Sequence, residues 1–69
     1  MLKIKDNVDL KELEKFGFGI DENGYYFNND YNVVVLRVNI QTRKISNRGD
    51  RKGNELFYDL IKADLVEKI

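Results

Sequence analysis

The chain has 69 residues, and its 12 lysines and arginines balance 12 aspartates and glutamates, so the formal net charge is zero. It contains no histidine, cysteine, tryptophan or proline. This length allows one small domain, residues 1–69, with a single core. Without histidine or cysteine, the usual structural zinc site, thiol redox chemistry and an imidazole-activated nucleophile are excluded. We therefore expect a protein that is not an enzyme and that uses no metal and no cofactor.

The cellular location is predicted from two patterns that the sequence does not show, a secretory leader and a membrane-spanning helix. No charged segment followed by an apolar one opens the chain, and the longest apolar run covers only residues 33–36. A membrane-spanning helix needs about 20 apolar residues. Together with the absence of cysteine, these features predict a cytoplasmic protein without a membrane partner.

Charge is distributed unevenly along the chain. Residues 1–32 carry four lysines and seven acidic residues, and residues 54–69 carry two lysines and four acidic residues. Residues 33–53 carry six basic residues, including all four arginines, against a single aspartate. This segregation is the global feature that favours a role in recognition.

The first 17 residues predict a strand or extended arm and then a helix. Residues 1–5 alternate between apolar and charged side chains, as a short edge strand does. Asp9 can cap a helix over residues 10–16, and Glu12 lies three residues later, as in a capping box. Gly17 can adopt the left-handed conformation that ends a helix.

From residue 18 the apolar pattern changes to a period of two, which is typical of strands. Asn23-Gly24 is a strong signal for a two-residue hairpin turn, because a type I′ turn needs positive φ at both positions. A turn there pairs Ile20 with Phe27.

Two further turns extend this hairpin into an antiparallel meander. A turn at residues 29–30 pairs Tyr25 with Val34, and a third turn sets Ile45 opposite Val38. The three turns agree, because they place one apolar set on one sheet face: Phe18, Ile20, Tyr25, Phe27, Val34, Leu36, Val38, Ile40 and Ile45.

The last third of the chain predicts a loop and a helix. Residues 47–54 have no apolar member and two glycines, which indicates an exposed loop. Residues 55–68 have no glycine or proline and predict a helix capped by Asn54. Its apolar side chains form two stripes, a wide one of Phe57, Tyr58, Ile61, Leu65 and Ile69 and a narrow, opposite one of Leu56, Leu60 and Ala63.

The expected fold is therefore a single α+β domain in the order helix, three- or four-stranded antiparallel meander, helix. Both helices are expected on the apolar sheet face. The narrow stripe of the second helix is then left over, so it either contacts the first helix or supports self-association into a homodimer.

The basic middle segment has two interpretations. Its side chains could bind phosphates, with Tyr26 and Tyr31 stacking on bases, and this would make the chain a small nucleic-acid-binding protein. Alternatively, the cations lie on a solvated edge and pair with acidic groups of the same chain. A neutral total charge weakens the first interpretation. The residues concerned are Arg37, Arg43, Lys44, Arg48, Arg51 and Lys52.

The outer sheet face is the leading candidate for a protein partner. Tyr26, Val33, Val35 and Arg37 are expected to point away from the core, and Tyr, Val and Arg on one exposed face resemble a binding surface. The alternative is ordinary strand propensity, which favours Val and Tyr in either orientation.

Several segments resemble a group of small uncharacterised proteins of phages and prophages of Gram-positive bacteria. The matching segments are LEKFGF at 13–18, GYYF at 24–27, TRKI at 42–45 and LFYDLIKADLVEK at 56–68. They are structural motifs, so no site residues come with the resemblance. It implies a non-enzymatic accessory protein that binds a host protein, such as a defence component, or another phage protein.

Overall fold

The computed structural model describes residues 2–69, which form six strands and two helical segments. Strands β2 to β5 form a four-stranded antiparallel meander, and β1 pairs antiparallel with β6 in a two-stranded sheet. The α+β class, the meander and a strand near the N-terminus are thus confirmed, although residue 1 of the expected strand lies outside the described residues. The elements are β1 (Leu2–Ile4), η1 (Leu10–Phe16), β2 (Gly19–Asp21), β3 (Gly24–Asn28), β4 (Val34–Asn39), β5 (Ile45–Asn47), α1 (Arg51–Lys62) and β6 (Val66–Lys68).

The first helix occupies the predicted residues, but it is a 3₁₀ helix. The Asp9 carboxylate caps it by accepting a hydrogen bond from the Lys11 backbone N–H at 2.9 Å. The Glu12 carboxylate does not complete a capping box and instead pairs with Lys15 at 2.8 Å. Gly17, with φ of 92°, ends the helix as expected.

The first hairpin has its turn one residue earlier than predicted. The loop residues are Glu22 and Asn23, and Ile20 pairs with Tyr25. The reason is the Asp21 carboxylate, which accepts hydrogen bonds from the backbone N–H groups of Asn23 and Gly24 at 2.9 and 3.0 Å. The pairing differs from the predicted one by two residues, an even number, so the same side chains keep the same face.

The second turn is longer than predicted, because an asparagine side chain organises it. Asn29 Oδ1 accepts hydrogen bonds from the backbone N–H groups of Tyr31 and Val33. Tyr25 consequently pairs with Val38, four residues beyond the predicted partner. The third register is confirmed, since Val38 does pair with Ile45.

The C-terminal helix differs from its prediction at both ends. It starts at Arg51 with Asp50, not Asn54, as the cap, and it ends at Lys62. Asp64 adopts a left-handed φ of 63° and reverses the chain, so residues 66–68 form a strand and not the last turn of a helix. The predicted loop at 47–54 is therefore half helix.

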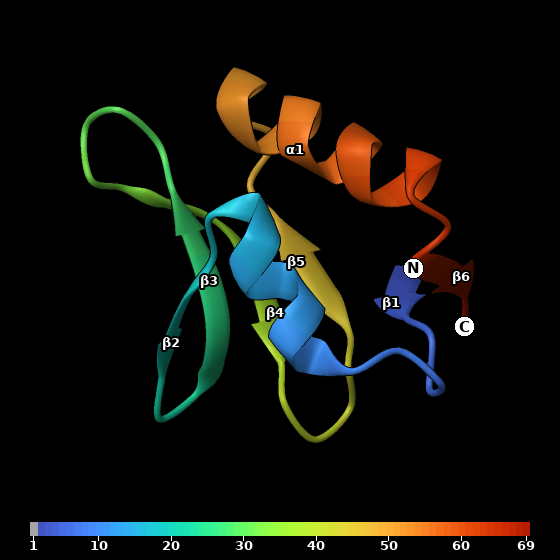
Figure 1. Ribbon diagram of the computed structural model, residues 1–69. Coiled ribbons are helices and arrows are strands. Elements are labelled where there is room, and N and C mark those ends of the chain that lie inside the picture. The colour runs from blue at the N-terminus through green and yellow to red at the C-terminus, as the bar shows by residue number, and fades with distance from the viewer. Residues whose placement is uncertain (1) are drawn as a thin grey trace.

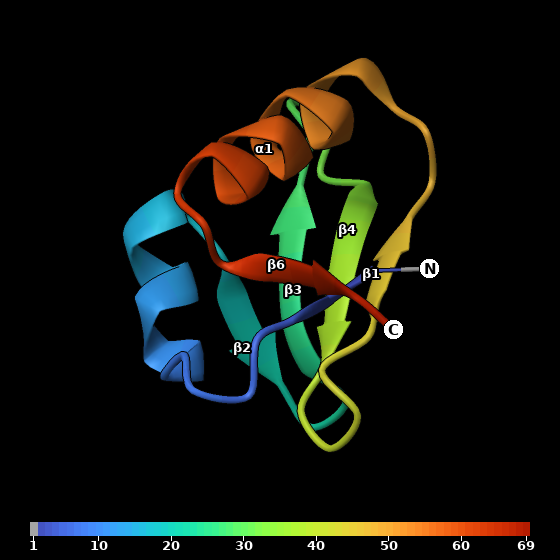
Figure 2. The same ribbon diagram turned by 90° about the vertical axis from the view of Figure 1, so that its right-hand side faces the viewer.

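One face of the meander carries the core. Buried side chains from this face, from η1, from β1 and from α1 form one cluster: Ile4, Leu13, Phe18, Tyr25, Leu36, Val38, Ile45, Leu56 and Leu60. Figure 2 shows β1 and β6 crossing in front of the sheet, with α1 along one end and η1 at one side. The other face of the meander has no helix over it (Figure 1).

The two sheets meet where β1 passes the start of β5. Lys3 lies opposite Lys44, and the Ile4 backbone N–H donates a hydrogen bond to the Arg43 carbonyl at 2.9 Å. The strands therefore follow one another around the core as β2, β3, β4, β5, β1 and β6. At its N-terminal end, the free edge of β5 is covered by β1. The outermost strands of this arrangement are therefore β2 and β6.

Candidate interaction surface

The face of the meander that points away from the core carries a row of polar side chains. Tyr26, Arg37 and Ser46 pair across β3, β4 and β5 in one register row. Lys44 and Arg48 lie two residues before and after Ser46, so alternation places them on the same side. We call these five residues the outer face.

The Tyr26 end of the outer face is held by contacts within the chain. The Tyr26 ring lies over Gly19, where a Cβ atom would be only 2.7 Å from it, and the Arg37 guanidinium carbon is 5.9 Å from the ring centroid. Arg37 also pairs with Asp21 at 3.0 Å. This hydrogen bond, with those from the backbone N–H groups of Asn23 and Gly24, holds the pKa of Asp21 below its usual value.

The other end of the outer face is open. Lys44 and Arg48 are exposed, and within residues 2–69 neither forms an ion pair. Two shallow hollows meet at Arg37 and Ser46, one of about 240 Å³ towards Arg48 and one of about 400 Å³ towards Lys44. Ile45, whose side chain belongs to the core, also borders the larger hollow.

Arg43, a predicted contact residue, is used inside the molecule. Its guanidinium Nη1 donates hydrogen bonds to the backbone carbonyls of Lys5 and Val8 at 2.7 and 2.6 Å. These bonds join the β4–β5 turn to the segment between β1 and η1. The side chain is half-buried there, so it is not on the outer face.

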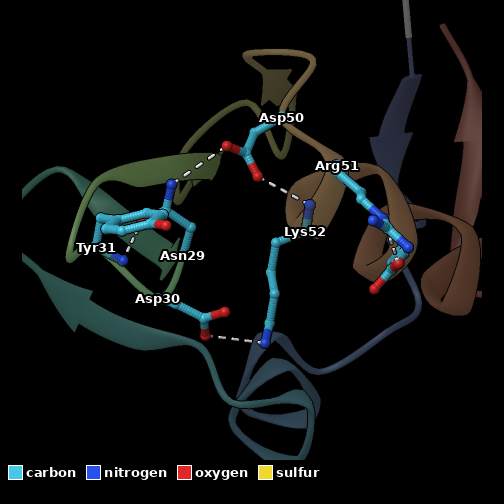
Figure 3. A pocket seen from close by; sticks show the side chains of 7 residues that line it. Asn29, Asp30, Tyr31, Asp50, Arg51 and Lys52 are labelled. Atoms are coloured by element: carbon cyan, nitrogen blue, oxygen red, sulfur yellow. Dashed lines mark hydrogen bonds and ion pairs between the residues drawn. The ribbon is translucent and has the colours of Figure 1, made fainter.

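Arg51 and Lys52 lie at a different place, beside a hollow of about 480 Å³ (Figure 3). Lys52 pairs with Asp30 at 3.1 Å, and Arg51, 93% exposed, approaches Glu55 at 3.5 Å. The Asp50 carboxylate accepts hydrogen bonds from the Lys52 backbone N–H and from the Asn29 amide. These bonds hold the pKa of Asp50 below its usual value.

The hollow of Figure 3 is therefore not an anion site at the start of α1, because a carboxylate of the chain itself already satisfies the helix N-terminus. Its lining side chains alternate in sign and pair with one another. We assign no binding function to it.

The predicted apolar contact residues are corrected by their burial. Val35 is only 2% exposed and packs against Gly53 of α1, so it does not contribute to an exposed surface. Val33, 40% exposed, lies in the loop before β4. The β3–β4 register shifts between Phe27 and Asn28 and skips Val35, so alternation from Arg37 does not place Val35 on the outer face, and the start of α1 packs against it.

The predicted self-association stripe is wrong for a related reason. Leu56 and Leu60 are 7% and 0% exposed and belong to the core of their own chain, while Ala63 is exposed at the end of α1. The exposed apolar side chains of the helix are instead Tyr58 and Ile61, from the stripe that was expected to face the sheet.

Ser46 and Asp21 belong to the site but were missed in the sequence. The alternation of 44, 46 and 48 along one strand could have indicated Ser46. The pairing of Asp21 with Arg37 depends on the observed register and has no local signal.

The described residues hold no group of three His, Cys, Asp or Glu side chains suited to a metal ion. Neither helical segment of residues 2–69 has the length and apolar composition that crossing a membrane requires. No protein-family model, no curated protein and no solved structure matches the chain.

Proposed function

We propose that this chain is a non-enzymatic protein-interaction module that contacts its partner through the outer face. The observation that carries the proposal is the pair of exposed cations, Lys44 and Arg48, on either side of Ser46. Within residues 2–69 they have no acidic partner, and they border two hollows that meet at the strand between them. A complementary charge on a partner would steer association and fix its orientation on this face.

A nucleic-acid partner is the competing function, and the internal contacts of the basic segment weigh against it. Four of its six cations already have acceptors in the chain: Arg37, Arg43, Arg51 and Lys52. Binding through phosphates depends on many simultaneous cation contacts. Two free cations on a chain with no net charge provide a weak basis for it.

The resemblance to small phage and prophage proteins supports an accessory role for this module. In that role the partner is a protein of the host or of the phage, and the work of the chain is binding without chemistry. The absence of histidine and cysteine from the sequence is consistent with such a role.

The proposal is tested by comparing what two charge-reversed variants capture from a host lysate. Lys44→Glu/Arg48→Glu reverses the open cations of the outer face. Lys11→Glu/Lys68→Glu makes the same change in net charge at two exposed lysines on η1 and β6. A partner identified by mass spectrometry and verified with purified protein should bind the wild type and the control, and it should be lost with the outer-face variant. Equal capture by both variants would contradict the proposal.

A further inference from the structure

We infer that the outer face binds an extended, acidic protein segment whose two carboxylates lie four residues apart. The inference rests on the proposed function and specifies the chemistry of the partner. Lys44 and Arg48 flank β5 on either side and are four residues apart, which is about 13 Å for an extended chain. An extended segment that runs along β5 presents side chains with the same spacing, so carboxylates at positions i and i+4 match both cations.

The charges around the outer face favour an acidic partner. The acidic groups at its margins are already neutralised, Asp21 by Arg37 at 3.0 Å and Glu67 by Lys3 at 3.7 Å. Lys44 faces another lysine, Lys3, across the isolated bridge between β1 and the start of β5. The surface along β5 between Lys44 and Arg48, which we call the strip, therefore carries two positive charges, and both Asp21 and Glu67 are engaged by other cations.

The Asp50 carboxylate, on which the charge of Arg48 acts, does not change this conclusion. The charge of Arg48 contributes to lowering the pKa of Asp50, but it is the smallest of the causes. That carboxylate is occupied by the Lys52 backbone N–H at 2.8 Å and the Asn29 amide at 3.2 Å. The Arg48 guanidinium remains available to a ligand.

The shape of the strip suits a protein segment. Between the two cations lie Ser46, a short side chain, and a hollow of about 400 Å³ with Ile45 in its lining. A side chain between the two carboxylates of the ligand would enter this hollow. Strand addition at the β5 edge is not required, and β1 already covers the start of that edge.

Single-stranded nucleic acid fits the same strip less well. Base recognition without sequence preference relies on aromatic side chains whose ring faces are free for stacking. Tyr26 is the aromatic residue of the outer face, and its ring is occupied by Gly19 on β2 and by the Arg37 guanidinium. The strip therefore offers two charges without a stacking platform.

The test selects short random peptides on the wild-type chain and measures the binding of the enriched peptides by fluorescence anisotropy. We expect acidic residues at i and i+4 among them. Lys44→Gln and Arg48→Gln should each weaken binding by about 1.5- to 5-fold, as for exposed ion pairs. Lys11→Gln and Lys68→Gln are the matched controls and should leave it unchanged. Amide shifts on binding should be confined to β4 and β5 and the residues that flank them.

The outcomes distinguish the inference from the proposed function. Enriched peptides that change the amide chemical shifts of the outer face but lack acidic residues at i and i+4 would overturn the inferred spacing of the two carboxylates. The proposed protein-binding function would still hold. Failure to enrich any peptide, or enriched peptides that shift only amides elsewhere, would overturn both. Oligothymidine is the nucleic-acid probe. If it binds more tightly than the best peptide and depends on Lys44 and Arg48, the nucleic-acid function replaces both.

Discussion

Removing the Arg43 side chain is expected to loosen the connection between the two sheets. Its guanidinium donates to the carbonyls of Lys5 and Val8 at 2.7 and 2.6 Å, and both distances are typical of charge-assisted hydrogen bonds. Each hydrogen bond to a charged group contributes about 1.5–3 kcal/mol to stability. Because the side chain is only half-buried, water can replace part of this contribution. For Arg43→Ala we therefore expect a loss at or below the lower end of the sum for the two bonds, about 2–3 kcal/mol.

The backbone of Arg43 provides an internal control. Its φ is 64°, in the left-handed region that glycine adopts without strain. Arg43→Gly loses the same hydrogen bonds but relieves about 1 kcal/mol of backbone strain, so it should be more stable than Arg43→Ala. Both hydrogen bonds come from Nη1, so the lysine of Arg43→Lys has the donors for both carbonyls but a shorter side chain, and it should lie between the alanine variant and the wild type.

Urea unfolding followed by circular dichroism measures these differences. A domain of this size has a free energy of unfolding of about 3–10 kcal/mol, so the alanine variant should lose a large fraction of its stability. Native-state hydrogen exchange should accelerate at the Ile4 amide, which donates to the Arg43 carbonyl. An alanine variant within about 0.5 kcal/mol of the wild type, or one more stable than the glycine variant, would refute the reasoning.

Three further predictions test the register, the core and the ion pairs. Gly24→Ala should cost at least about 3 kcal/mol in urea unfolding, because φ is 141° and a Cβ atom would collide with the Val38 carbonyl oxygen; near-wild-type stability would contradict the observed register. Leu60→Ala should cost about 2–5 kcal/mol at every protein concentration, whereas exposed Tyr58→Ala should change stability by less than about 0.5 kcal/mol; equal effects would place Leu60 outside the core. The lowered pKa of Asp21 means that its contribution is present above its ordinary pKa and is lost as the pH falls below about 4. Asp21→Asn should therefore lose less stability than the wild type on acidification, and an identical acid transition would show that its ion pair is not stabilising.

The two helix ends show which features the sequence could and could not predict. Each helix ends in a Schellman motif, in which Phe18 N–H donates to the Leu13 carbonyl and Leu65 N–H to the Leu60 carbonyl. In the first motif the left-handed residue is Gly17, which is visible in the sequence. In the second it is Asp64, and an aspartate carries no strong signal for that conformation. The predicted helix therefore continued to residue 68, where the structure has a strand.

Which face of α1 is buried was predicted incorrectly, because it depends on where α1 ends. A helix that continued to residue 68 would have its widest apolar stripe at Phe57, Ile61 and Leu65. Once the chain turns at Asp64 and β6 pairs with β1, Leu65 leaves the helix, and Leu56 with Leu60 faces the core. The strand pairing is a contact between the two ends of the chain, and local periodicity contains no information about it.

The meander was predictable despite two wrong turns because strand patterns tolerate errors of an even number of residues. Shifts of two and four residues changed every cross-strand partner of Tyr25, yet its side chain remained in the core. The contacts on the outer face depend on which residues lie opposite one another across the strands, and not only on which side of the sheet each side chain occupies. These contacts were therefore less predictable. The pair of Asp21 with Arg37 exists only in the observed registers.

The uneven distribution of charge along the sequence is explained by ion pairs that form within the fold. The acidic ends of the chain supply partners for the basic middle, since Asp21 and Asp30 hold Arg37 and Lys52, and Glu55 approaches Arg51. Three of the six cations of residues 33–53 are thus paired with acidic groups within the fold, and this pairing weakens the attraction of the segment for a polyanion at long range. What remains is local, because Lys44 and Arg48 flank the short strand β5 four residues apart. A fixed spacing of two charges selects a ligand by geometry, and this is why we argue for a particular acidic segment over anionic partners in general.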